Sequence, residues 1–356
     1  MYKYKILKNK IEKKLNLLSY RRKSNYFGRA NSAIWCIGEF LKKNSTKRII
    51  ILPSTMCVSP AIIFKLLGFK LEFVDVNKSN GLLNVKKVIK TINEKNNEIA
   101  CIFYVNLFGN KDLEARKLKN FKKIFIIQDL AQTFLNKENI KSDVFGDLII
   151  LSFGYSKIFD LDHGGIVLSN NDKFYNYGLK FDEKIKNTNV SNIGKKKYLR
   201  WYDDVIIKKK KNSLKNLRSF ASKIYLIKFN NKKLTQINNS LNLLSKEFKR
   251  RNSLFKVYKK KITKLKLNII HSKDTFIPWR FSFLINNKDF YLKLIRKKGN
   301  DASSYYPNIG RAFSNKKNKN SYVNSDLIQE KVINFWLTKE YNRNRIDKIC
   351  SLLNDK

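Results

Sequence analysis

The sequence is poor in residues that bind metals or form disulfides. Its 356 residues include only four cysteines, which lie far apart and form no CxxC pair: Cys36, Cys57, Cys101 and Cys350. The two histidines, His163 and His271, do not fall at metal-ligand spacing. We therefore expect no metal site, and free thiols in a reducing compartment.

Long uncharged apolar runs are also missing. The first residues, MYKYKILKNKIEKKLNLL, are interrupted by lysines throughout and do not resemble a secretory signal. No stretch of about 18 uncharged apolar residues occurs, so we expect no helix that spans a membrane. These features predict a cytoplasmic protein, for which a peripheral contact with anionic lipid stays open.

Acidic residues are scarce: 28 Asp and Glu stand against 75 Lys and Arg, giving a formal net charge of +47. Such an excess usually indicates binding to nucleic acid or to an anionic membrane. Here lysine, asparagine and isoleucine are abundant along the whole chain, which is typical of compositional bias. Arginine binds phosphate and guanine better than lysine does, but it is the rarer of the two basic residues here. We therefore expect no specific nucleic-acid partner, but a field that favours anionic substrates.

Short apolar runs alternate with amphipathic segments through the first half of the chain. Helices are expected at 30–42, 60–67 and 84–95, and strands at 48–52, 70–76, 99–105, 123–129 and 147–153. Strands that are apolar throughout predict a mostly parallel sheet covered on both faces. Later segments include a strand at 278–286 and a last helix at 341–353. We predict an α/β fold with three parts: an N-terminal helical extension (1–24), a large α/β domain (25–230) and a small C-terminal α+β domain (231–356).

Polar residues follow the predicted strands where each strand ends. Parallel sheets bind ligands beyond the carboxyl ends of their strands, so these residues should converge on one crevice: Ser54, Thr55, Asn106, Asp129, Ser152 and Lys157. A lysine that is partly desolvated there has a lowered pKa and can form a Schiff base with an aldehyde cofactor such as pyridoxal phosphate. The alternatives are a surface loop lysine and, for Asp129, an N-cap of a helix at 130–135.

That cofactor makes two further demands. Its ring nitrogen needs a carboxylate, which Asp129 at the end of a buried strand could supply. Its phosphate needs N–H groups at a helix start together with hydroxyls. The segment GRANSA (28–33) offers Ser32 and the amides after it, and Ser152 offers another hydroxyl.

Six ordered motifs together resemble the DegT/DnrJ/StrS family of pyridoxal-phosphate sugar aminotransferases. They are GRANSAI, LPSTMCVSPAIIFKLLGFKLEFVDV, YVNLFGN, IIQDLAQTF, FGDLIILSFGYSK and DHGGIVLS. The family pattern Asp-x-x-Gln matches Asp129 and Gln132, and Ser-Phe-x-x-x-Lys matches Ser152 to Lys157. The similarity is clear over residues 25–170 and faint elsewhere. It implies the type I (aspartate-aminotransferase-like) fold of pyridoxal-phosphate enzymes.

The resemblance also implies roles for individual residues. Lys157 would carry the cofactor and shuttle the proton, Asp129 would pair with the ring nitrogen, and Gln132 would lie near the phenolic oxygen. Ser152, Ser32 and the Ala33 amide would hold the phosphate, and Thr55 and Met56 would cover the ring face. Asn239, in LTQINNS, would reach the phosphate of a neighbouring subunit in a homodimer.

The sequence departs from the family pattern at several positions. Met56 stands where an aromatic residue often stacks on the ring, Asn106 where a histidine is common, and His163 where a glutamate is common. His163 could be a base or a satisfied loop histidine. Tyr305 and Tyr306 could line the site or belong to the core. These departures leave the sugar open.

The function expected from these features is transfer of an amino group, with glutamate as donor, to a nucleotide-linked keto-sugar for a surface polysaccharide. Three alternatives remain: a sugar dehydratase, a non-enzymatic regulatory or binding protein on the same scaffold, and a basic nucleic-acid binder. Dehydratases of the family carry histidine at the lysine position, so Lys157 disfavours the first. Retention of both Asp129 and Lys157 disfavours the second.

Overall fold

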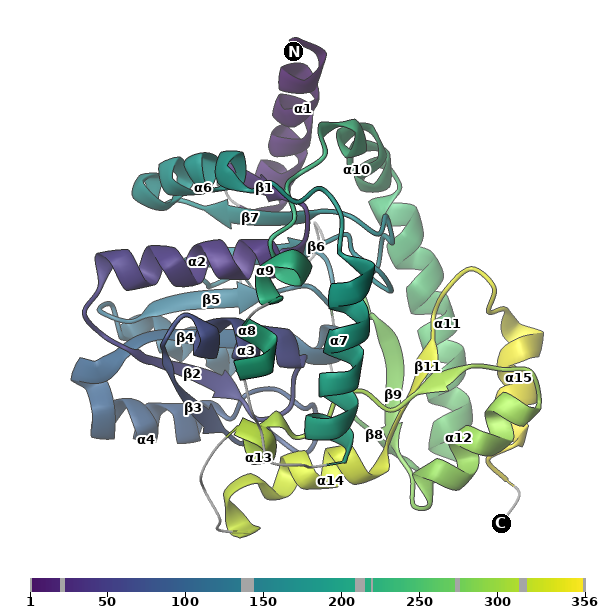
Figure 1. The fold of residues 1–356 in the computed structure, drawn as a ribbon. Coiled ribbons are helices and arrows are strands. Elements are labelled where there is room, and N and C mark those ends of the chain that lie inside the picture. The colour runs from purple at the N-terminus through teal and green to yellow at the C-terminus, as the bar shows by residue number, and fades with distance from the viewer. Residues whose placement is uncertain are drawn as a thin grey trace.

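The computed structural model describes residues 2–19, 23–135, 144–208, 215–218, 220–272, 276–313 and 319–354. Two sheets form its framework (Figure 1). The larger has the order β1-β7-β6-β5-β4-β2-β3 and the smaller the order β10-β11-β9-β8. The predicted α/β class with a mostly parallel central sheet is confirmed.

The large sheet is parallel from β6 to β3, and β7 runs antiparallel to both of its neighbours, β6 and β1. Its strands are β1 (Lys23–Phe27), β2 (Ile49–Pro53), β3 (Lys70–Val74), β4 (Ile99–Val105), β5 (Phe125–Asp129), β6 (Leu148–Ser152) and β7 (Gly165–Ser169). Strands β2, β4, β6 and β7 are buried at every residue. Both faces are therefore covered, as the apolar runs predict.

Alternate residues of the strands feed two separate cores. Ile49 and Ile51 pack with helix α4 (Val85–Lys95) on one face. Ile50 and Leu52 pack on the other face with helices α2 (Ala30–Asn44) and α3 (Val58–Leu66). This alternation follows from the two-residue period of a strand. Helix α6 (Asp172–Lys184) continues the second layer beside α2 (Figure 1).

The small sheet is antiparallel throughout and carries its own core. Its strands are β8 (Asn268–Ile269), β9 (Arg280–Leu284), β10 (Ala302–Ser303) and β11 (Val332–Trp336). The helices α11 (Leu244–Lys264), α12 (Lys288–Lys297) and α15 (Arg343–Ser351) supply the apolar residues that cover it.

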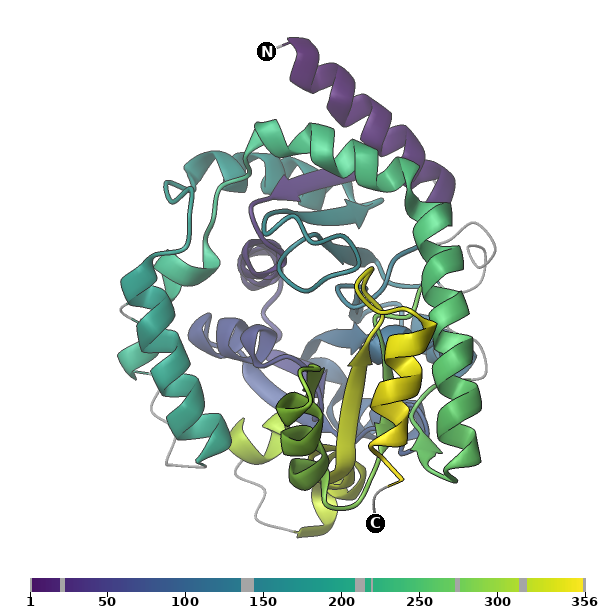
Figure 2. The same cartoon turned by 90° about the vertical axis from the view of Figure 1, so that its right-hand side faces the viewer.

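The remaining helices connect or extend these two bodies. They are α1 (Tyr2–Ser19), α7 (Asn192–Tyr202), the π-helix η5 (Asp203–Ile207), α8 (Lys215–Arg218), α9 (Ala221–Tyr225), α10 (Leu234–Asn242), α13 (Ile309–Phe313) and α14 (Val323–Lys331). Short 3-10 helices are η1 (Asn96–Glu98), η2 (Leu107–Gly109), η3 (Leu113–Asn120), η6 (Asn231–Lys233) and η7 (Lys319–Tyr322). Helix α1 projects beside α10 (Figure 2), and Lys14 donates to Asn238 there (2.6 Å). Among the described residues, no helix is long and apolar enough to span a membrane.

Hydrogen bonds join the two bodies beside β2 and β3. The Asp75 carboxylate accepts from the N–H (3.1 Å) and hydroxyl (2.9 Å) of Ser325 in α14. The Ser54 and Ser325 hydroxyls lie 2.5 Å apart, and Thr55 forms an isolated bridge with Asn308. Residues such as Ile309 and Ile328 pack into the core of the large body. The C-terminal segment is thus attached to the large body beside β2 and β3. The three domain boundaries stay predictions.

Candidate active site

Lys157 lies on the loop that follows β6. The loop folds back on itself, since the Phe153 N–H donates to Gly164 O (2.9 Å) and the Leu161 N–H donates to Phe153 O (2.9 Å). The Lys157 N–H donates to Gly154 O (3.3 Å). The side chain is partly buried, in contrast to the exposed lysines that dominate the surface. The loop therefore holds this one amine against the body of the protein.

Asp129 ends β5 and lies close enough to Lys157 for each charge to affect the ionisation of the other. Burial raises the pKa of Asp129 to about 6, and the Ala131 N–H (2.8 Å) and the Lys157 charge act against that rise. Burial also lowers the pKa of Lys157, while Cys57 and Asp129 act to raise it. No helix follows Asp129 over 130–135, so it is not a helix N-cap. The structure thus brings the predicted amine and carboxylate into one crevice.

Gln132 and Ser152 lie beside this pair and each keeps a donor free. The Gln132 carbonyl oxygen accepts from the Phe108 N–H (2.9 Å), which leaves its amide nitrogen without a partner among the described residues. Ser152 ends β6, is 7% exposed, and accepts weakly from the Gly154 N–H (3.4 Å). Its hydroxyl hydrogen is therefore available. Both side chains can donate to an oxygen of a bound molecule.

Thr55 and Met56 follow β2 and are both buried. The Thr55 hydroxyl has no hydrogen-bond partner among the described residues. Leaving a buried hydroxyl unpaired costs free energy, so this atom indicates a missing partner at the crevice. Met56 packs within the core of the large body.

Ser32 and Ala33 do not present the groups that the sequence predicts for the phosphate. The Ser32 hydroxyl donates to Tyr225 O (2.7 Å) and accepts from the Ile227 N–H (2.9 Å), and the Ala33 N–H donates to Arg29 O (3.2 Å). Ser32 instead fastens helix α2 to the segment after α9. We correct the prediction accordingly, because both groups already have partners inside the protein.

Asn239 and Asn106 have different surroundings. Asn239 is exposed on α10, where only another molecule could bring it to a site, and its predicted role across a dimer stays a prediction. Asn106 is buried in a chain of amides: it accepts from Gln128 (3.0 Å) and donates to Asn110 O (2.8 Å). Asn106 therefore ties β4 to β5 and to the loop after it.

His163 is a satisfied loop histidine. Its Nε2 accepts from the Asn230 N–H (2.9 Å), and burial lowers its pKa to about 4. Tyr306 is buried and stacks on Trp279 (6.0 Å between ring centroids), with Asp129 near enough to influence its ionisation, whereas Tyr305 is 45% exposed. Tyr306 thus belongs to the hydrophobic core and lies near Asp129.

Sequence reasoning missed Trp279 and Arg280, which it included only in a strand. The Trp279 indole N–H donates to Ser156 O (2.6 Å), and the Lys157 ammonium lies 6.0 Å from the centroid of its ring. Arg280 is buried and lowers the pKa of Lys157. One sign was available: a single charged residue within a strand of apolar and aromatic residues.

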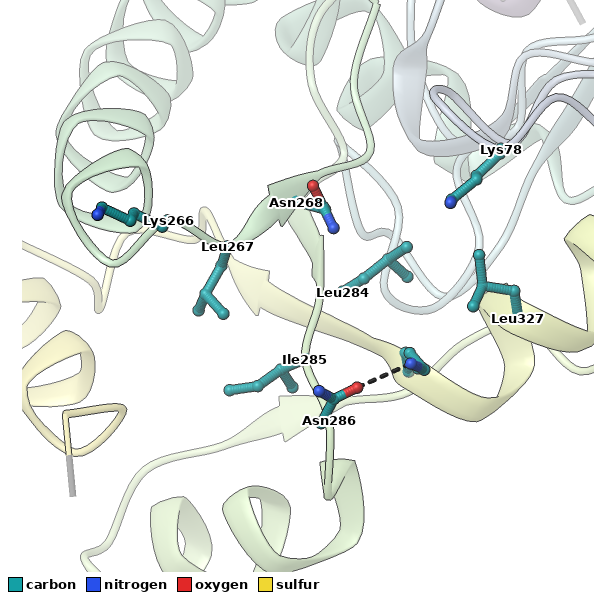
Figure 3. A pocket seen from close by; sticks show the side chains of 9 residues that line it. Lys78, Lys266, Leu267, Asn268, Leu284, Ile285, Asn286 and Leu327 are labelled. Atoms are coloured by element: carbon teal, nitrogen blue, oxygen red, sulfur yellow. Dashed lines mark hydrogen bonds between the residues drawn. The ribbon is translucent and has the colours of Figure 1, made fainter. Parts of the chain in front are cut away.

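A second hollow lies away from these residues, between β8, β9 and α14 (Figure 3). Its lining includes three lysines, of which Lys331 donates to Asn286 (2.7 Å). None of the predicted site residues lines it, and the described residues contain no His, Cys, Asp and Glu cluster suited to a metal ion. The surroundings of Lys157, rather than this hollow, therefore remain the candidate active site.

The groups in this crevice fit pyridoxal phosphate. An amine of lowered pKa suits the aldehyde, and a buried carboxylate suits the ring nitrogen. The Gln132 amide and the Ser152 hydroxyl can donate to the cofactor's oxygens. The unpaired Thr55 hydroxyl is a further group that a bound molecule could satisfy.

Comparison with known proteins gives matches along most of the chain. The sequence profile of the DegT/DnrJ/EryC1/StrS aminotransferase family matches residues 39–354. GDP-perosamine synthase of Escherichia coli O157:H7 is 28% identical over 135 residues, which cover 37% of this chain and only 36% of that enzyme.

Two solved structures illustrate the likeness in fold. A DegT DnrJ EryC1 StrS aminotransferase from Brucella abortus has a TM-score of 0.73 at 17% identity, covering 97% of this chain and 89% of that chain. The E. coli GDP-4-keto-6-deoxy-D-mannose-3-dehydratase with bound hydrated PLP has a TM-score of 0.74 at 15% identity. The match covers 98% of this chain and 91% of that chain. The predicted type I fold is therefore confirmed. Because the family profile spans most of the sequence, the chain belongs to the DegT/DnrJ/EryC1/StrS aminotransferase family.

Proposed function

We propose that this enzyme moves an amino group from an amino acid, glutamate, to a nucleotide-linked keto-sugar. The product would be an amino sugar for a surface polysaccharide. The observation that carries the proposal is that the Lys157 amine and the buried Asp129 carboxylate lie close enough for each to shift the pKa of the other. The names of the relatives support the substrate class, since one is a GDP-perosamine synthase and another acts on GDP-4-keto-6-deoxy-D-mannose.

Lys157 would have two tasks. When bound, pyridoxal phosphate supplies an aldehyde that joins amines and a ring that withdraws electrons. Lys157 would hold the cofactor covalently and, once displaced by the donor, accept and return a proton at its Nζ. Burial lowers the pKa of this amine, which increases the neutral fraction able to act as a base.

The remaining residues would orient the bound cofactor and polarise its ring. The Asp129 carboxylate, with its pKa near 6, is ionised above that pH and can keep the ring nitrogen protonated. Gln132 would donate to the phenolic oxygen, and Ser152 to the phosphate. Thr55 and Met56 would contribute to the surface against the ring, and Asn239 would come from a second subunit.

The test uses purified protein loaded with pyridoxal phosphate. We expect a visible absorbance band that glutamate bleaches and that GDP-4-keto-6-deoxy-D-mannose then restores. Lys157→Ala should lack the band of lysine-bound cofactor. A band retained in Lys157→Ala would contradict the assignment of that residue, and a wild-type band unchanged by any amino acid would contradict amino transfer.

Dehydration is the second candidate, because a dehydratase shares the fold at a TM-score of 0.74. Lys157 favours amino transfer, since by family resemblance the dehydratases carry histidine at this position. Analysis of the sugar product separates the two reactions: an aminated sugar supports the proposal, and a sugar that has lost an oxygen without gaining nitrogen contradicts it.

A further inference from the structure

Arg280 is a buried arginine with no acidic partner among the described residues. It is 2% exposed, and its guanidinium carbon lies 4.0 Å from the Trp279 ring centroid and 3.5 Å from that of Trp336. One nitrogen donates to the Ser156 hydroxyl (2.8 Å) and another to the Ser303 hydroxyl. The Nε atom has no partner in the described part of the chain. The cation is thus held by two neutral hydroxyls and two aromatic rings.

Arg251 shows how this protein otherwise buries an arginine. Its Nε donates to the Glu247 carboxylate (2.6 Å), and further donors reach the carbonyl of Trp279 (2.9 Å). Near Arg280, the Asp301 carboxylate accepts instead from the Trp336 indole N–H (2.9 Å) and forms no ion pair with Arg280. A buried charge without a counter-ion is costly, and burial lowers the Arg280 pKa to about 10. An anionic ligand would remove this cost.

The guanidinium and the Lys157 amine lie near the same indole ring. The guanidinium carbon lies 4.0 Å and the Lys157 Nζ 6.0 Å from the Trp279 ring centroid, and the Arg280 charge lowers the pKa of Lys157. Ser156, Trp279 and Trp336 surround Arg280 and also line, with Lys157, a cavity of about 120 Å³. Tyr305, 5.8 Å from the guanidinium, is 45% exposed. Side chains that hold Arg280 thus also border the space beside Lys157.

We propose that Arg280 binds a carboxylate of the amino-acid donor and so places the donor's amine at Lys157. The proposal deepens the proposed function and rests on it. The planar fork of a guanidinium matches the two oxygens of a carboxylate. In an amino acid, amine and α-carboxylate share one carbon, whereas in a nucleotide sugar the ring separates the diphosphate from the reacting carbon. Arg280 and Lys157 have Trp279 as a common neighbour, which suits the amino acid better.

The first test separates the two half-reactions. Arg280→Met should raise the glutamate concentration needed for half-maximal bleaching by about 10- to 100-fold, the range for a lost hydrogen bond to a charged group. The second half-reaction, started from protein loaded with pyridoxamine phosphate, should keep its dependence on the keto-sugar. Arg280→Lys should recover part of the loss, and Arg343→Met, which removes an exposed arginine of α15, should change neither half.

Two results would overturn the proposal in this test. A loss confined to the keto-sugar half would assign Arg280 to the diphosphate instead. An equal loss in both halves would indicate a structural role. If the wild type does not bleach with any amino acid, the proposed function itself fails, and the second test still decides whether Arg280 binds a carboxylate.

The second test needs no turnover. Glutarate, a dicarboxylate without an amine, should change the tryptophan fluorescence of the wild type through Trp279 and Trp336, whereas neutral glutaramide should not. Arg280→Met should lose the response and be at least as thermally stable as the wild type without ligand, because it removes an unpaired buried charge. No glutarate response in the wild type, or a clear loss of stability in Arg280→Met, contradicts the proposal.

Discussion

At the scale of single residues, burial decides which charges this protein can use. Its surface carries dozens of lysines, whereas Lys157 is partly buried and feels the charges of a carboxylate, Asp129, and of a second cation, Arg280. Asp129 and Arg280 are both buried, and both influence the pKa of Lys157. Desolvation shifts each of their pKa values toward the neutral form. A ligand that pairs with both groups would therefore gain binding energy from relieving these penalties.

Asp129→Asn should stabilise the cofactor-free protein. The Asp129 pKa is raised from 3.8 to about 6, so the folded state loses stability relative to the unfolded state as pH rises from about 4 to 6. Above pH 6 the penalty amounts to about 3 kcal/mol. Urea unfolding of Asp129→Asn and wild type should diverge over this range, with Asp289→Asn, an exposed carboxylate of α12, as control. If the difference in unfolding free energy between Asp129→Asn and the wild type is the same at pH 4 and pH 7, the burial of the Asp129 charge is contradicted.

Both histidines should remain neutral at physiological pH. In each ring Nε2 accepts a backbone N–H, from Asn230 for His163 and from Ser282 for His271 (2.9 Å each). Burial lowers their pKa values to about 4 and about 3. Stability should thus be lost as pH falls below the ordinary value near 6.5. With only two histidines, NMR can follow each ring, and a ring that titrates near pH 6.5 would show the assignment to be wrong.

How far the sequence predicts the site depends on the kind of information each residue carries. Strand ends that meet at one edge of a parallel sheet brought Lys157 and Asp129 together in the prediction, and the structure places their charges within reach of each other. Gln132 was predicted from the family pattern, and the role of each residue stays a prediction. Ser32 was placed correctly at a helix start, but its hydroxyl direction depends on residues 225–227, far along the chain. The role of Arg280 depends on the lack of an acidic neighbour, which only the folded chain reveals.

At the scale of elements, the strands with continuous apolar runs were predicted within one to two residues at most ends. The five-residue strands β1 and β11 were missed, as were the two-residue strands β8 and β10. The sequence of β1, KSNYF, is polar at its start, and it is buried because it pairs with β7 beside α6. Strand β11 follows α14 without a turn that would separate them. Tertiary packing, rather than local pattern, creates both strands.

Gly165 is the point where β7 meets the start of α2, and a side chain there should disturb the site. A Cβ at 165 would lie 2.5 Å from the Ala30 nitrogen and 2.6 Å from the Arg29 carbonyl carbon, both backbone atoms. Gly165→Ala should therefore cost about 1–3 kcal/mol of stability and weaken cofactor binding. Gly154→Ala, whose nearest contact would be 3.6 Å, is the matched control. Denaturant unfolding and cofactor titration measure both effects, and two indistinguishable variants would refute the packing argument.

At the scale of the whole molecule, the proposed homodimer assigns Asn239 to the site of the partner. If each site takes Lys157 from one chain and Asn239 from the other, a mixed dimer of Lys157→Ala and Asn239→Ala chains has one intact site. Unfolding and refolding the two variants together should restore about a quarter of wild-type activity. Sizing chromatography checks the dimer. No recovery, with Asn239→Ala inactive alone, would place Asn239 in its own chain's site or in none.

The bonds from Asp75 and Ser54 to Ser325 have a consequence for motion. They anchor the C-terminal body to the strand edge at β3, while the other end of the crevice, near Lys157 and Tyr305, has an exposed side chain at its mouth. If the enzyme closes over its substrates, we expect the C-terminal body to rotate about a hinge at these bonds rather than to move as a whole toward the large sheet. Residues near the hinge would keep their distances to β2 and β3 through the catalytic cycle. Residues far from the hinge would undergo the largest displacements.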